Sequence, residues 1–134
     1  MIRRAQVIDL RKIIDLTYEF NNLYYHTSLS YSKTSEMITH IIEHGTCFVS
    51  DEGYIGGLII PDPLRDANAL VEMGWFAKDN SGGKLLDVFI EEGHRLAVDE
   101  IRMCTMSTSP TVADKIILRK GFSLAETQYR LNTK

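Results

Sequence analysis

The stretch VEMGWFAKDNSGGKLLDVFI, Val71–Ile90, decides how this chain of 134 residues is organised. Its first part belongs to an apolar segment, Ala69–Phe76, that predicts a buried strand. A short polar loop with Gly82 and Gly83 follows, and a helix is expected to begin near Lys84. Because glycines let the backbone approach a ligand and the first N–H groups of a helix have no partner inside it, this arrangement suits an anion such as phosphate. An ordinary strand-to-helix turn explains the glycine pair equally well.

Composition places the chain among ordinary globular domains. It is 44% apolar and 25% charged, which argues against a disordered chain, and its length predicts a single domain, 1–134. The formal net charge of −3 gives no support for a nucleic-acid partner. We find no apolar run of about 18 residues and no N-terminal signal pattern, so we expect a cytoplasmic protein with no membrane partner. Cys47 and Cys104 both lie in apolar runs that are typical of strands, and we expect lone buried thiols, with a disulfide between them as the alternative.

Helical periodicity precedes the central stretch in two segments. We expect one helix over residues 5–22 and a second that begins with serine caps within Ser32–Ser35 and ends at Gly45. The segment between them, Leu23–Tyr31, has no clear period and is expected to be a loop. Its three tyrosines either contact a substrate or fix the loop to the core. They are Tyr24, Tyr25 and Tyr31.

Strand patterns account for most of the remaining chain. They are Met1–Arg4, Thr46–Ser50, Tyr54–Ile60, Ala69–Phe76, Glu100–Met106 and Phe122–Leu131. The second and third of these form a hairpin, in which Gly56-Gly57 predicts a bulge or a close backbone approach. A helix that ends near Ala97 joins the fourth strand to the fifth, so these two strands are expected to be parallel. A last helix is expected to begin at Ser109-Pro110 and to end at Gly121.

The second helix contains an H-x-x-E-H string, formed by His40, Glu43 and His44. Two histidines one turn apart with a glutamate are the zinc motif of one class of metalloprotease. The helix is expected to end directly after the string, and no third ligand is evident in the sequence. A polar helix face explains the same residues, and we expect no metal site.

The element order β-α-α-β-β-β-α-β-α-β resembles that of the GCN5-related N-acetyltransferase (GNAT) family. The local strings that carry this resemblance are IRRAQVIDLRKIIDL at 2–16, VEMGWFAKD at 71–79, KGF at 120–122 and ETQYR at 126–130. The resemblance covers nearly the whole chain. It implies an α/β fold with a mixed, mostly antiparallel central sheet flanked by helices, in which the fourth and fifth strands splay apart.

The resemblance also implies a co-substrate, acetyl-CoA, lying in the cleft between the splayed strands. The fourth strand would then pair with the pantetheine through Gly74, Trp75 and Phe76, and the loop amides would hold the pyrophosphate. The loop residues in this role are Ser81, Gly82, Gly83, Lys84 and Leu85. Members of the family are commonly dimers, so a homodimer is a possible assembly.

The activity that the resemblance implies is transfer of an acetyl group to a primary amine of a small molecule or a protein. The resemblance makes Glu72 the candidate general base, because several members of the family use a carboxylate of the fourth strand, directly or through water. A raised pKa, expected for a carboxylate in a splayed cleft, suits that role; pairing with a neighbouring cation is the alternative. The general acid is expected to be Tyr129, a tyrosine of residues 24–31, or water.

Four positions depart from the family pattern. Lys78 stands where the family loop has Gln or Arg, and Ser81 stands where it has its first Gly. Ile117 occupies the place of a tyrosine that many members use near the departing thiolate. An asparagine often found after the fifth strand is replaced by Ser107, Thr108 or Ser109. A second hypothesis is therefore a GNAT-fold binding or regulatory protein with impaired catalysis.

Overall fold

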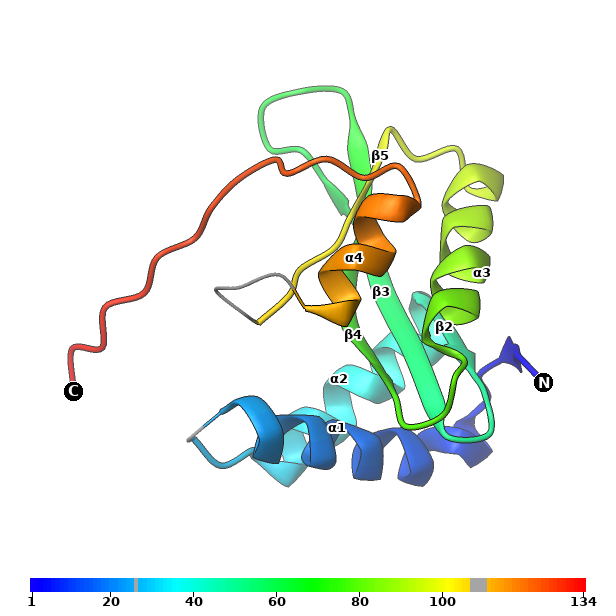
Figure 1. Ribbon diagram of the computed structural model, residues 1–134, viewed down its shortest axis with the longest axis vertical. Helices are drawn as coiled ribbons and strands as arrows, with labels where there is room; N and C mark the ends of the chain where they lie inside the picture. The colour runs from blue at the N-terminus through cyan, green and yellow to red at the C-terminus, as the bar shows by residue number, and fades with distance from the viewer. Residues whose placement is uncertain (26, 107–110) are drawn as a thin grey trace. The chain divides into compact units, whose positions relative to one another are not determined.

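The computed structural model describes residues 1–25, 27–106 and 111–134, and their contacts divide the chain into two units, Met1–Cys104 and Thr105–Lys134. The first unit contains one sheet with the strand order β1-β2-β3-β4-β5 (Figure 1). Neighbouring strands are antiparallel except β4 and β5, which are parallel as the sequence predicts. The strands are β1 (Arg3–Arg4), β2 (Thr46–Val49), β3 (Gly53–Pro61), β4 (Asn68–Ala77) and β5 (Glu100–Arg102).

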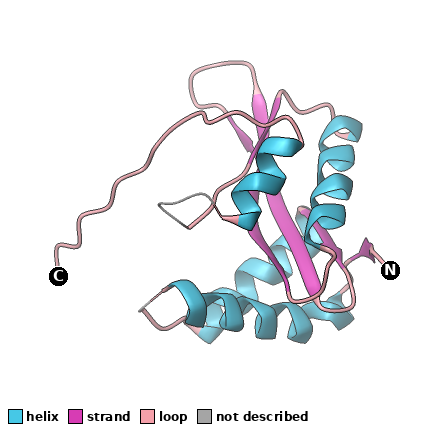
Figure 2. Cartoon of the chain, viewed as in Figure 1, coloured by secondary structure: helices cyan, strands magenta, loops and turns pink. Residues whose placement is uncertain are grey.

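Helices cover both faces of this sheet. They are a short 3-10 helix (Val7–Asp9), α1 (Leu10–Tyr24), α2 (Tyr31–His44) and α3 (Gly82–Arg95) (Figure 2). Successive residues of a strand point to opposite faces. A side chain at Gly56 of β3 would meet Ile41 of α2, whereas one at Gly57 would meet Phe89 of α3. The α1–α2 pair therefore packs on one face of the sheet and α3 on the other.

The predicted irregularity at Gly56-Gly57 is a β-bulge, and it lies next to the centre of β4. Gly56 pairs with Gly74 and Gly57 pairs with Glu72, so Met73 has no opposite residue on β3. A bulge bends the strand and increases its twist. It therefore redirects β4 directly after Glu72.

The ladder between β4 and β5 covers only three residues on each strand and ends where Val71 pairs with Arg102. β4 continues to Ala77, while β5 is shorter than the predicted Glu100–Met106. This early end of the ladder agrees with the expected divergence of the fourth and fifth strands. It also corrects the prediction for Cys104, which is exposed because it lies beyond the end of β5.

The ends of α1 and α2 differ from the prediction, and the loop between them is shorter. Asn21 does not end α1, because it is buried and its side-chain amide donates to the backbone oxygen of Thr27 at 2.9 Å. The helix continues to Tyr24, whose ring lies 4.8 Å from that of Phe20, one turn earlier. The N-cap of α2 is Ser30, which accepts from the Lys33 N–H.

The second unit contains α4 (Val112–Arg119), whose N-cap is Thr111. The expected start at Ser109-Pro110 lies outside the described residues. Gly121 follows α4 with φ of +98°, a backbone angle typical of the residue after a helix. The predicted strand Phe122–Leu131 is wrong: these residues have no regular structure, because an alternating pattern makes a strand only where another strand supplies hydrogen bonds. Within the described residues, no helix is long and apolar enough to cross a membrane.

Candidate active site

Glu72 is the carboxylate nearest to the bulge of β4. It is partly buried, and its Oε1 accepts a hydrogen bond from the backbone N–H of Cys104 at 3.3 Å. Burial raises the pKa of Glu72 to about 7, against the smaller lowering effect of that hydrogen bond. Because this pKa lies near neutrality, Glu72 exchanges protons readily at the pH where a general base is needed.

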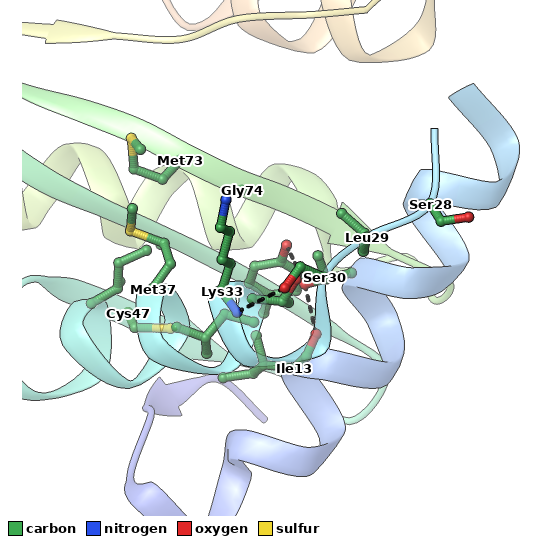
Figure 3. Close-up of a pocket in the computed structure, with 15 residues that line it drawn as sticks. Ile13, Ser28, Leu29, Ser30, Lys33, Met37, Cys47, Met73 and Gly74 are labelled. Atoms are coloured by element: carbon green, nitrogen blue, oxygen red, sulfur yellow. Dashed lines mark hydrogen bonds between the residues drawn. The ribbon is translucent and has the colours of Figure 1, made fainter. Parts of the chain in front are cut away.

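A cavity of about 460 Å³ lies between the α1–α2 pair and strands β3 and β4 (Figure 3). Its β4 wall is formed by Met73 and Gly74, the two residues that follow Glu72. Its apolar floor comes from buried residues on three elements, which are Ile13, Ile38, Ile41 and Cys47. Such a volume and lining are typical of a small-molecule site. The cavity therefore ends beside the backbone that follows the candidate base.

Tyr54 lines this cavity and is fixed in place by a hydrogen bond to Thr17. Thr17 donates to the Ile13 carbonyl at 2.8 Å, and the Tyr54 hydroxyl donates to the Thr17 oxygen at 3.0 Å. Burial raises the pKa of Tyr54 to about 12, so its hydroxyl keeps its proton. A side chain at Gly74 would come within 2.5 Å of that hydroxyl. The phenol therefore fits over the β4 backbone only because residue 74 is glycine.

The loop before α3 is organised around a carboxylate, Asp79. It accepts hydrogen bonds from the backbone N–H groups of Ser81 at 3.0 Å and Glu52 at 3.1 Å, and from the hydroxyls of Ser81 and Ser50. These bonds, above all the one from the Ser81 hydroxyl, hold the pKa of Asp79 below its usual range. A protein carboxylate thus already occupies part of the anion-binding turn that the sequence predicts.

The rest of the turn still fits a phosphate. The amides of Gly82, Gly83 and Lys84 open α3 and have no partner inside the helix. A side chain at Gly82 would meet nothing closer than 4.0 Å, so the space beside the first residue of α3 is not filled by other side chains. The Trp75 indole donates to the Gly82 carbonyl at 3.0 Å and so fixes the turn to β4. Lys84 adds a positive charge beside a second cavity of about 420 Å³ that also contacts Asp79 and Ser81.

The structure brings several predicted site residues together. Trp75 joins β4 to the loop, and Gly74 and Phe76 share the sheet face that carries α1 and α2. Tyr24 and Tyr25 pack on Phe20, which contacts Phe76 at 5.7 Å between ring centres. The side chain of Leu85 is fully buried, so only its backbone can face a ligand.

Other predicted residues lie elsewhere. Tyr31 is exposed at the first turn of α2, and none of the three substrate-binding tyrosines lines the cavity of Figure 3. Tyr129 belongs to the second unit and its side chain is 90% exposed. Sequence reasoning missed Thr17, Lys33 and Tyr54, which line the cavity. In the sequence, only the apolar face of α2 gave an indication of the region in which they lie.

The H-x-x-E-H string remains a feature of the surface of α2. The rings of His40 and His44 are 5.2 Å apart, and Nε2 of His44 lies 3.8 Å from a Glu43 oxygen. In the part of the chain that the structure describes, no group of three or more His, Cys, Asp or Glu side chains is placed to hold a metal ion.

Comparison with known proteins finds proteins of similar structure, all of low sequence identity. No family model matches the sequence, and no curated protein matches it significantly. One similar solved structure, described as a probable acetyltransferase, has a TM-score of 0.76 at 16% identity, with 100% of this chain and 98% of the other covered. Another is AAC(6')-Iy in complex with the bisubstrate analog CoA-S-monomethyl-acetylneamine, with a TM-score of 0.76 at 15% identity and coverage of 100% and 97%.

A third similar structure is an acetyltransferase from Trypanosoma brucei, with a TM-score of 0.69 at 16% identity and 98% of both chains covered. All three matches extend over nearly the full length of both proteins, although the sequences have diverged widely. The chain therefore has the fold of the GCN5-related N-acetyltransferases.

Proposed function

We propose that the chain transfers an acetyl group from acetyl-CoA to a primary amine, and that Glu72 takes the proton of the amine. The observation that carries this proposal is the position of Glu72, where the β4–β5 ladder ends and the bulge begins. Its pKa of about 7 suits a general base, and the next two residues line a cavity large enough for an acceptor.

The residues that would hold acetyl-CoA are those of β4 and the loop. Past Val71, the edge of β4 has no β5 residue opposite it, so its backbone groups suit an extended chain such as pantetheine. The amides of Gly82, Gly83 and Lys84, with the Lys84 ammonium, suit the pyrophosphate. Acetyl-CoA supplies the activated acetyl group. We expect modest affinity, because the Asp79 carboxylate lies beside the phosphate position.

In the reaction, the neutral amine nitrogen forms a bond to the acetyl carbon and the carbon–sulfur bond breaks. Glu72 accepts the proton that the amine gives up, directly or through water. The departing sulfur takes a proton from water. Tyr24 and Tyr25 lie outside the cavity lining and reach Phe76 of β4 only through Phe20, so we give them a supporting role and assign Tyr31 none.

A thermal-shift experiment with acetyl-CoA, free CoA and ATP tests the first requirement. A ligand at about 100 times its dissociation constant adds about 2.7 kcal/mol to the free energy of unfolding. We expect a shift with both CoA forms and none with ATP, followed by turnover of acetyl-CoA in a panel of amines. No shift at millimolar acetyl-CoA would overturn the proposal and favour a binding protein on the same fold.

A further inference from the structure

The lining of the cavity in Figure 3 lacks the negative charge that an acceptor with several positive charges would require. Among the described residues that line it, Lys33 is the one charged residue, and none is a carboxylate. The remaining polar groups are hydroxyls, on Thr17, Ser28, Ser30, Thr34 and Tyr54. An acceptor with several ammonium groups would find no counter-charge here and would be repelled by Lys33.

Lys33 is placed to act on a bound molecule. Its backbone is fixed in the first turn of α2, where its N–H donates to the Ser30 hydroxyl at 3.3 Å. Figure 3 shows its side chain extending from α2 toward the strand that carries Met73 and Gly74. Within the described residues, no carboxylate forms an ion pair with Lys33. Its ammonium is therefore available to an anionic group of a ligand.

The rest of the lining is apolar and adaptable. Met37 of α2 and Met73 of β4 are partly exposed, and both line the cavity (Figure 3). Unbranched thioether side chains adjust to apolar ligands of different shape. Deeper in, the floor is formed by buried isoleucines of α1 and α2.

From these contacts we infer that the acceptor is a small amine with an apolar body and a carboxylate, in which the carboxylate pairs with Lys33. The apolar body contacts Met37 and Met73, and the amine points to the end of the cavity beside Glu72. This inference rests on the proposed acetyl transfer for the fate of the amine, whereas the pairing with Lys33 concerns binding alone.

The test uses three amines with the intact chain: 4-(aminomethyl)benzoate, its neutral analogue 4-methylbenzylamine, and spermidine. We expect kcat/KM to be highest for the carboxylate and lowest for spermidine. In Lys33→Met, KM for 4-(aminomethyl)benzoate should rise about fivefold at unchanged kcat, as for loss of one exposed ion pair, while 4-methylbenzylamine is unaffected. Lys33→Glu should shift the preference toward spermidine. Arg11→Met, which removes an exposed charge of α1 outside the cavity, is the matched control.

The outcomes separate the two proposals. Turnover with equal use of the carboxylate and neutral amines, or with an unchanged ratio in Lys33→Met, would overturn the acceptor class and leave acetyl transfer standing. If no amine is acetylated, calorimetric binding of 4-(aminomethyl)benzoate decides the pocket inference. Binding that weakens in Lys33→Met and at high salt supports it, since an exposed pair is screened. Absent binding, or equal binding by both proteins, overturns it.

Discussion

The side chain of Glu72 is tied to the backbone N–H of Cys104 by a hydrogen bond of 3.3 Å. This bond lies just past the last ladder pair, Val71 and Arg102. A side-chain contact thus replaces the backbone ladder at the point where β4 and β5 separate. The Glu72 carboxylate is therefore held just past the end of the ladder and remains outside the backbone hydrogen bonding of the sheet.

Replacing Glu72 by glutamine should lower kcat about 10²- to 10⁴-fold, the usual contribution of a general base. In the wild-type protein, kcat/KM should rise with pH through about 7, where Glu72 loses its proton. That rise should vanish in Glu72→Gln when rates are measured from pH 5.5 to 9. Glu91→Gln, at an exposed carboxylate of α3, is the control. An unchanged pH profile in Glu72→Gln would remove Glu72 from the reaction.

Glu72→Gln should also change the free energy of unfolding, and the size of this change should depend on pH. Because folding raises the pKa of Glu72 from 4.5 to about 7, the folded state favours the protonated form. The stabilisation this gives is complete below pH 4.5 and is lost as the pH rises through about 7. Glu72→Gln imitates the protonated form, so it should be more stable than wild type at pH 8, by at most about 3 kcal/mol, and equal at pH 4. Urea unfolding at both pH values measures this, and an equal difference at both would contradict it.

Asp79→Asn should lower the stability of the protein and raise its affinity for acetyl-CoA. The carboxylate of Asp79 accepts two backbone N–H bonds at the turn, so the variant should lose about 1 kcal/mol at pH 7. Because folding lowers the pKa of Asp79, this loss should shrink as the pH falls below 3.8.

The second half of the Asp79 prediction concerns binding of the co-substrate. Removing a negative charge from the start of α3 should tighten acetyl-CoA binding about threefold to fivefold. Isothermal titration measures this, with Asp66→Asn in the loop before β4 as the control. Equal or weaker binding in Asp79→Asn would place the pyrophosphate elsewhere.

Two glycine-to-alanine substitutions should have contrasting effects. A side chain at Gly57 would collide with the Val71 carbonyl and come within 2.8 Å of the Phe89 ring. Gly57→Ala should therefore cost more than about 2 kcal/mol of stability, or prevent folding. At Gly82 the nearest atoms are 4.0 Å away, so Gly82→Ala should fold with unchanged or slightly higher stability. Its effect should be confined to weaker CoA binding, and unchanged binding would argue against the loop site.

The sequence predicted those features that depend on local pattern. The apolar run Ala69–Phe76, the apolar stripe after Lys84 and the glycine pair at 56–57 each reflect a short-range preference, and the structure confirms the strand, the helix and the bulge. The residues of β4 and the loop to which the resemblance assigns acetyl-CoA binding lie close together because they are adjacent in the chain. Whether they bind acetyl-CoA stays a prediction.

Features that depend on distant residues were not predictable. Asp79 looked like a polar loop residue, because its partners Ser50 and Glu52 lie about one strand hairpin earlier in the chain. Nothing in the sequence distinguishes Lys33, because the cavity that it lines is formed by residues from distant segments of the chain. The final strand failed for the same reason, since residues 122–131 show a strand pattern without a strand to pair with.

The two thiols differ in a way that is useful for labelling. Burial raises the pKa of Cys47 to about 12 at the cavity floor, whereas Cys104 is exposed two residues after β5. Since the thiolate is the reactive form, a maleimide dye near neutral pH should attach to Cys104 alone. The natural sequence thus carries a single attachment point next to Glu72. A fluorophore on Cys104 would report ligand binding near the end of the β4–β5 ladder. No engineered cysteine would be needed for this measurement.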